Sequence, residues 1–493
     1  MEKPNVFICF DTEDPINPEA DDALLQLART YHRANLPACF FMVGEKARVL
    51  RERGRKDVLD ALQGHEIEYH GNYGFEYPEP ALVYGNRDPW DEAVQKGFTF
   101  EAPGIRDVAE ITGQFPVATC QHQNNHSPAT SLAMNQVGVR VWNGGLGAPM
   151  DGPGWVLGML VVGRNGRNVS SQGSWTKGFQ FDPDRPRRRP SVIDPKVELR
   201  QFQDRFETQL EQGHSHIIIL GHPTCWAMAE WWGWYDWSTP FRGANAEGKA
   251  GTYPHGRHWE RSIPRSPADT KAHLAWTATA ARWLAKRTDI RVTTFAQVLS
   301  EHEDPPGQWL SEHQIRSVAR QITRRFDFVT LGSTTLSAAD ALVVLSQYAE
   351  FMLREHRRPV RIQIRRTIGP VEQVLISKSP LTVNRQGLLM GARQVTQYVN
   401  AHGRLPHAIR LHRVDTGPAE LLLGLAAAIS SDRLPEEVTI NPTCGMPECA
   451  EMPFFARATA SSISAPPGYE PTQIHLQGRQ QSWSYRPARR RER

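Results

Sequence analysis

Short apolar segments of β-forming residues, separated by amphipathic helical patterns, constrain the fold of this chain more than any other feature. Segments 6–10 and 38–43 flank a helical pattern at 21–34, which Pro37 brings to an end. Strands that alternate with helices at this spacing predict βα units and a parallel sheet, although periodicity alone leaves open whether the sheet closes into a barrel. Further helical patterns lie at 46–62 and 270–286, and further apolar segments at 67–70, 139–142, 155–162, 216–220 and 290–294.

The character of the sequence changes near residue 305, where Pro305, Pro306 and Gly307 interrupt the pattern. The 493 residues are enough for two or three domains. We therefore expect an α/β domain over residues 1–305. Residues 313–493 are predicted to form a mainly helical domain of unassigned role that ends in an irregular basic tail. Its helical patterns lie at 312–326, 337–354, 391–402 and 418–430.

Charge and cysteine content exclude several classes of protein. The net charge is only +4, and the arginine runs at 185–189 and 486–493 accompany no nucleic-acid-binding motif, so no nucleic-acid partner is expected. Six cysteines in so long a chain do not make a disulfide framework, and reduced thiols fit a cytoplasmic protein. The sequence shows no signal-peptide pattern and no apolar run long enough to span a membrane, so we expect a cytoplasmic protein.

Acidic residues follow directly after the first apolar segment. Asp11, Glu13 and Asp14 come where a barrel strand would end, which is where barrel enzymes hold metals and catalytic bases. Carboxylates are hard oxygen ligands for a divalent cation, and one of the three could act as a base instead. The alternative is a turn whose acidic side chains only cap the following helix.

Two histidines also follow predicted strands. His70 ends the segment at 67–70, and His222 follows the segment at 216–220. A neutral imidazole is a common zinc ligand, and a histidine near its ordinary pKa is a good general acid for a departing amine. If the strands lie in one parallel sheet, Asp11, His70 and His222 are expected to converge at its carboxyl edge. A lone buried histidine is otherwise a hydrogen-bonded core residue.

Tryptophans crowd the segment after His222, including Trp226, Trp231 and Trp234. Indole faces stack on sugar rings, so this segment is a candidate carbohydrate-binding surface. The alternative is a lid that packs on the barrel rim and buries its large side chains.

These motifs resemble those of the NodB-type polysaccharide deacetylases, over roughly residues 1–300. Residues 6–15 are similar to the family's first motif, residues 38–44 to its second strand, and residues 64–70 to its second motif. Residues 116–128 are similar to its third motif, and residues 220–222 to its last motif. A His-Pro at 222–223, the residues 242–245 and the residues 483–488 are similar to one bacterial branch of that family.

The resemblance implies a distorted NodB-type (β/α) barrel and metal-assisted removal of N-acetyl groups from a sugar. A divalent metal, preferably zinc, would be held by His70 and by Asp14 or Glu13. Asp11 would be the catalytic base and His222 the catalytic acid. Trp226, Trp231 and Trp234 would bind the carbohydrate.

The sequence departs from the family at two positions. Gly74 stands where the second motif has another histidine, and Cys120 stands where the third motif carries an arginine that orients the catalytic aspartate. Catalytic zinc sites usually have three protein ligands, so either Glu76 or His122 completes the site, or the metal is weak or absent. A non-catalytic carbohydrate-binding protein and an amidase for a small non-sugar amide therefore remain alternatives.

Overall fold

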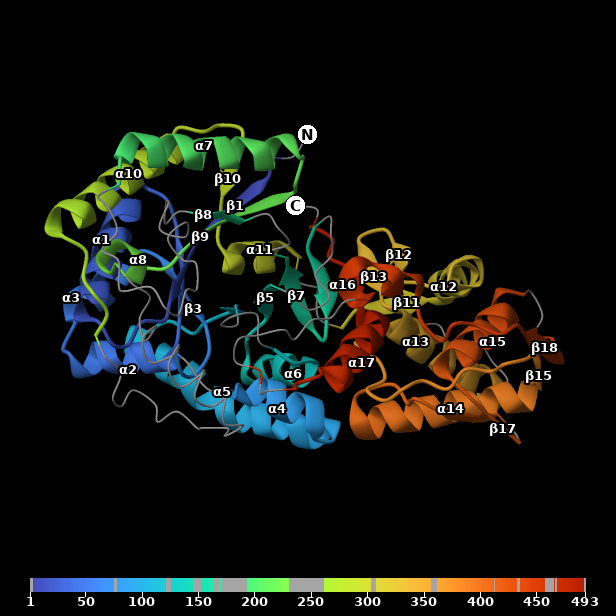
Figure 1. Ribbon diagram of the computed structural model, residues 1–493. Helices are drawn as coiled ribbons and strands as arrows, with labels where there is room; N and C mark the ends of the chain where they lie inside the picture. Colours follow the sequence, from blue (N-terminus) through green and yellow to red (C-terminus); the bar gives the residue numbers. More distant parts are fainter. Residues whose placement is uncertain are drawn as a thin grey trace.

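The computed structural model describes residues 3–74, 78–120, 126–144, 152–163, 168–170, 193–229, 261–302, 307–355, 361–411, 413–431, 435–456, 465 and 468–491 (Figure 1). A curled, mostly parallel sheet with helices around it forms the N-terminal part, and a mainly helical part follows. Both features of the expected fold are therefore confirmed. None of the helices in the described ranges combines the length and the apolar composition that a membrane span needs.

The sheet is a distorted barrel of βα units. Within the described residues its strand order is β19-β6-β7-β5-β4-β3-β2-β1-β9-β8, and β10 also pairs with β1. All neighbours from β5 to β8 along this order run parallel, whereas β6 and β19 join it antiparallel. The strands are β1 (Asn5–Thr12), β2 (Cys39–Met42), β3 (Glu66–Tyr69), β4 (Ala118–Thr119), β5 (Val141–Asn143), β6 (Gly154–Val156), β7 (Met159–Val162), β8 (Asn168–Ser170), β9 (His216–Gly221), β10 (Arg291–Val292) and β19 (Arg486–Pro487).

Helices surround the outer face of this sheet (Figure 1). The sequence pattern at 46–62 becomes two helices, because Gly54 has a positive φ of 65° between them, a conformation that glycine adopts without strain. The helices are α1 (Pro18–Arg33), α2 (Gly44–Glu52), α3 (Lys56–Leu62), α4 (Pro80–Arg87), α5 (Trp90–Thr112), α6 (Pro128–Val137), α7 (Pro195–Glu211), α8 (Thr224–Ala227), α10 (Pro267–Ala285) and α11 (Phe295–His302).

Alternation along the strands divides the apolar residues between two cores. On β1, Val6, Ile8 and Phe10 face the helices, and they belong to the larger core between helices and sheet. Phe7 and Cys9 point to the other face, where they form the barrel interior together with inward residues of the neighbouring strands. The continuation of this inward face beyond Cys9 carries the next alternate residue, Asp11.

The C-terminal part contains the same arrangement twice. Each copy runs β-α-β-β-α-β, its first and last strands pair with each other, and its middle strands form a hairpin. Between the copies, α13 packs against α14 and α12 against α15. The elements are β11 (Trp309–Ser311), α12 (Glu312–Arg324), β12 (Val329–Leu331), β13 (Thr334–Leu336), α13 (Ala338–Glu355), β14 (Arg361–Gln363), β15 (Leu381–Asn384), α14 (Arg385–His402), β16 (Ile409–Leu411), β17 (Val414–Thr416), α15 (Pro418–Ser430) and β18 (Glu437–Ile440).

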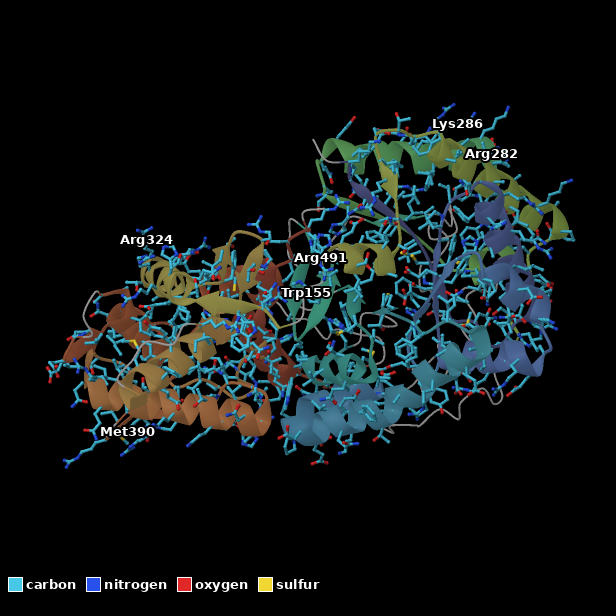
Figure 2. The ribbon with its side chains drawn as sticks, turned by 180° about the vertical axis from the view of Figure 1, so that it is seen from behind. Trp155, Arg282, Lys286, Arg324, Met390 and Arg491 are labelled. Atoms are coloured by element: carbon cyan, nitrogen blue, oxygen red, sulfur yellow. The ribbon has the colours of Figure 1, made fainter. Side chains whose placement is uncertain are left out.

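The end of the chain returns to the barrel sheet. After η3 (Glu448–Glu451), α16 (Pro453–Ala456), α17 (Thr472–Gln480) and η4 (Gln481–Ser484), β19 pairs with β6, with Arg486 opposite Trp155. The guanidinium of Arg486 lies 5.1 Å from the centre of the indole ring of Trp155. Figure 2, seen from behind, shows Trp155 and Arg491 between the two parts of the molecule. Arg404 adds a two-pronged ion pair to Asp91, with hydrogen bonds of 2.7 and 2.9 Å.

Candidate active site

The site is built from residues that follow adjacent parallel strands. In the order β9, β1, β2, β3 and β4, the carboxyl ends of the strands meet at one edge of the sheet. His222 follows β9, Glu13 follows β1, His70 follows β3 and Cys120 follows β4, each by one position. The register places Phe10 of β1 beside Gly221 of β9, so the residues that follow them, Asp11 and His222, come at the same level. The topology therefore gathers side chains that are up to about 200 residues apart in the sequence.

Two carboxylates face two imidazoles at this edge. His70 Nε2 lies 3.9 Å from Asp11 Oδ2 and 3.3 Å from Glu13 Oε2. His222 Nε2 lies 3.6 Å from Asp11 Oδ2 and 3.7 Å from Glu13 Oε1. The predicted convergence of Asp11, His70 and His222 is therefore observed, and Glu13 joins them.

Burial separates the two histidines. The side chains of Asp11, Glu13 and His70 are at most 5% exposed, whereas that of His222 is 17% exposed. His222 is therefore the member of the group that solvent or a bound molecule reaches most easily. Two carboxylates this deeply buried require nearby positive charge, because an uncompensated buried charge is costly.

The ring orientation of His70 is fixed by the main chain. Its Nδ1 hydrogen-bonds to the carbonyl oxygen of Cys120, and because a carbonyl only accepts, Nδ1 carries the proton. In the neutral ring the lone pair is then on Nε2, which faces the carboxylates. Burial on its own lowers the pKa of His70, but Asp11, the Cys120 carbonyl and Glu13 outweigh it, and the pKa lies well above its ordinary value.

Asp14 has a different environment from the other two acids. One carboxylate oxygen accepts from the backbone N–H groups of Ile16 and Asn17 at 2.9 and 3.0 Å. The other accepts from the Asn17 side chain at 3.0 Å and from the Thr224 hydroxyl at 2.8 Å. Burial raises the pKa of Asp14 in spite of Lys46 nearby. Asp14 thus ties the loop after β1 to helix α8, directly after His222.

A buried ion pair holds the same loop from its other side. Lys46 of α2 donates to the main-chain oxygen of Asp14 at 2.5 Å and pairs with Asp21 of α1. Asp21 is completely buried and also pairs with Arg53 at 2.9 Å. The acidic loop is therefore held between α1, α2 and α8 rather than exposed on the rim.

The donor atoms at this edge suit a divalent cation. Ligand atoms of Asp11, His70 and Cys120 all lie within 4.8 Å of one another, and all three side chains are buried. Carboxylate, imidazole and thiolate are the three ligand types that zinc takes in proteins. Between the two predicted acidic ligands, Glu13 is the better placed, because the oxygens of Asp14 already accept four hydrogen bonds.

Of the three tryptophans proposed to bind carbohydrate, only Trp226 lies in the part of the chain that the structure describes. Trp226 of α8 is fully buried, donates its indole N–H to Thr277 at 2.8 Å and packs edge-on against Phe10. It therefore follows the packing alternative and forms no exposed stacking surface in this structure. Trp231 and Trp234 lie outside the described residues, as do residues 242–245 and the two proposed replacement ligands Glu76 and His122.

Sequence reasoning missed two contributions to the site. It treated Cys120 only as the loss of an arginine, although Ala118 and Cys120 alternate on the inward face of β4. It also passed over Thr224, whose hydroxyl is a plain hydrogen-bond donor without a motif of its own. The alternation of inward residues is the signal that could have identified Cys120. It is hard to recognise in the sequence because β4 has only two residues.

A separate cavity of about 670 Å³ lies at the junction of the two parts of the molecule. Trp155 and Arg140 line it from the barrel, and Asp340 and Arg366 line it from the C-terminal part. None of Asp11, Glu13, His70 and His222 is among its lining residues. It is therefore distinct from the strand-end site.

All six cysteines are unbridged, as expected for a chain without a disulfide framework. Five of them are buried, and only Cys444 is exposed. Cys120 can therefore act as a thiol rather than as half of a disulfide.

Comparisons with known proteins are limited to structure. No protein-family model matches the sequence, and no curated protein matches it. A protein from Mycobacterium smegmatis assigned to the polysaccharide deacetylases aligns with 60% of this chain and 90% of its own, at 15% identity and a TM-score of 0.38. The peptidoglycan deacetylase PdaC from Bacillus subtilis aligns with 65% of this chain and 98% of its own, at 13% identity and a TM-score of 0.31.

A CE4 family pseudoenzyme from Bacillus anthracis aligns with 45% of this chain and 57% of its own, at 14% identity and a TM-score of 0.27. The solved structures to which this chain is similar thus include deacetylases of polysaccharides and peptidoglycan together with a pseudoenzyme of the CE4 family.

Proposed function

We propose that this protein is a metal-dependent hydrolase that removes N-acetyl groups from a sugar. One observation carries the proposal: two carboxylates and two imidazoles converge at the carboxyl edge of the barrel sheet, with imidazole-to-carboxylate distances of 3.3 to 3.9 Å. Such an edge is where barrel enzymes place their catalytic groups. The sugar substrate is inferred from the motif resemblance of residues 1–300 to the NodB-type deacetylases.

The chemical roles follow from the difference in exposure between Asp11, which is 5% exposed, and His222, which is 17% exposed. Asp11 takes a proton from the attacking water as that water adds to the acyl carbon. The carbon–nitrogen bond then breaks, and His222, the more exposed imidazole, gives a proton to the departing amine nitrogen. Water and the amide are consumed, and acetate and the free amine are formed.

His70 and Glu13 are the residues that would hold a divalent cation beside these two groups, with Asp14 as the alternative acid. When bound, such a cation polarises the acyl carbonyl and makes the attacking water more acidic. Glu13 is preferred because its carboxylate lies 3.3 Å from His70 Nε2, and zinc is the preferred metal because of the mixed donor set. Asp14 instead ties the loop after β1, in which Glu13 lies, to α8.

A second candidate function is non-catalytic binding of a carbohydrate. Gly74 favours it, because this position offers no side-chain ligand, and its N–H is occupied by Glu45 at 3.1 Å. The chain could then keep a sugar-binding surface without turnover. The third alternative, an amidase for a small non-sugar amide, uses the same residues and differs only in substrate.

The test is acetate release from N-acetylglucosamine oligomers with added zinc, cobalt or nickel. We expect release that depends on the metal and falls by about 10²–10⁴-fold in the Asp11→Asn variant, which is the usual contribution of a general base. Asp22→Asn, on the exposed face of α1, is the matched control, because its side chain is 71% exposed. Oligomer binding without release, unchanged in Asp11→Asn, would instead support the binding function. Release only from small acylamides would support the third alternative.

A further inference from the structure

The ligand that Gly74 fails to supply has a replacement on a different strand. Cys120 directly follows β4, which is the neighbour of β3, and its backbone N–H bonds to Tyr69 at 3.2 Å. The residue next to Tyr69 is His70, so Cys120 and His70 lie side by side across the sheet. Cys120 is 1% exposed and points into the barrel, toward the same space as Asp11.

We propose that the Cys120 thiolate is a protein ligand of the cation that His70 holds, in place of the missing histidine. This inference rests on the proposed function for the existence of a metal site. The donor atoms of His70 and Cys120 lie within 4.8 Å of each other and of an Asp11 oxygen, so an ion held by His70 and Cys120 would lie beside the catalytic base. With Glu13, whose carboxylate lies 3.3 Å from His70 Nε2, these two residues make the three protein ligands of a catalytic zinc site.

The hydrogen bond of His70 supports this assignment. Histidine ligands almost always donate their second ring N–H to a carbonyl or carboxylate, which fixes the tautomer and the direction of the other nitrogen. Here the acceptor is the carbonyl oxygen of Cys120 itself. Residue 120 therefore orients the imidazole through its main chain and adds a donor through its side chain.

The thiolate also decides which metals fit. Sulfur is a soft ligand that favours zinc and cobalt over magnesium, calcium or manganese, which prefer oxygen. The thiol proton leaves to solvent when the ion binds, as for other cysteine ligands. The site therefore differs in selectivity from an all-oxygen and imidazole site on the same scaffold.

Cobalt(II) bound to the full chain is the probe, because zinc has no d–d or ligand-field signal of its own. We expect a near-ultraviolet thiolate-to-cobalt absorption band in the unmodified protein that disappears in Cys120→Ala and in Cys120→Ser. Cobalt affinity, measured by competition with a chelator, should fall by roughly 100-fold in Cys120→Ala, since losing even an outer partner of a ligand costs 10–100-fold. Cys9→Ala is the matched control, because Cys9 is equally buried in the barrel interior and should leave both band and affinity unchanged.

The outcomes separate this inference from the proposed function. Cobalt that binds without the band, or with a band that persists in both Cys120 variants, overturns the role of Cys120 and leaves a metal-dependent hydrolase intact. A Cys120-dependent band without acetate release supports the ligand and counts against the hydrolase. The circular dichroism spectrum of each variant shows whether it is folded, and Cys120→Ser keeps the test valid if the alanine variant is not.

Discussion

Both ends of the barrel contain carboxylates, but the groups that contact them differ. At the amino end of the strands, α11 closes the interior: Phe295 stacks on Phe7 with ring centres 4.5 Å apart, and each oxygen of Glu66 accepts a backbone N–H from the first turn of α11. At the carboxyl end, Asp11 and Glu13 face two histidines. A carboxylate is thus structural where the N–H groups of a helix bind it, and a functional candidate where it is buried against histidines that could hold a metal.

The largest expected effect is at the closed end. Phe295→Ala removes a fully buried ring that contacts Phe7 and Phe41, so it should lower the free energy of unfolding by about 3–5 kcal/mol. Because the ring lies at the opposite end from the site, the protein that remains folded should release acetate at the usual rate. Urea denaturation and an assay well below the melting temperature measure the two quantities. A loss of activity in the folded variant would show that the two ends are coupled.

At the carboxyl end of the strands, we expect a substitution to change metal affinity more than stability. Glu13→Gln keeps the shape of the side chain but removes one of two buried carboxylates that share the same two imidazoles, so stability without metal should fall far less than in Phe295→Ala. Metal affinity should fall by at least about 10–100-fold, which corresponds to roughly 1.4–2.8 kcal/mol. Chelator competition and thermal unfolding of the metal-free protein are the measurements. A loss of stability as large as that of Phe295→Ala would make Glu13 a structural residue.

We expect a smaller effect at Thr224, which supports the site through its hydrogen bond to Asp14. Thr224→Val keeps the volume but removes the hydroxyl that donates to Asp14, and it should cost about 1 kcal/mol of stability. The Asp14 carboxylate still accepts three hydrogen bonds, from Ile16 and Asn17, so kcat should fall modestly with little change in KM. Thr279→Val is the control, because the Thr279 hydroxyl bonds only within its own helix. Steady-state kinetics of both variants separate a role of Thr224 in the site from the general effect of replacing threonine by valine. Equal kinetics in both variants would remove Thr224 from the site.

The sequence predicted the parts of the site that follow strong strand signals. Segments 6–10 and 216–220 are apolar runs that end abruptly in Asp11 and shortly before His222, and a parallel sheet must bring such ends together. Cys120 escaped notice because β4 has only two residues, too few for a period to show. Trp226 suggested a binding surface because composition does not reveal that a four-residue helix places its side chain in the core between helices and sheet, in contact with Phe10.

In the C-terminal part, the sequence predicted the helices but not the internal duplication. Helices α12 and α15 begin and end within a few residues of their sequence patterns. The duplication was missed because its signature lies in hairpins of three-residue strands and in the acids that follow them. Asp340 binds the N–H of Thr367, and Glu420 correspondingly binds that of Ser377, so both copies hold the linker between them. The matching strand pairing of the two copies is what reveals the repeat.

The return of β19 to the barrel has a consequence for how the protein is made. During synthesis, residues 1–305 leave the ribosome well before residues 486–487, so the outer edge of β6 waits unpaired for nearly two hundred residues. An unpaired edge strand is a template for association with other chains. The barrel therefore depends on residues 486–487 to cover the edge of its sheet, and a chain that stops before Arg486 should aggregate more readily than the full chain.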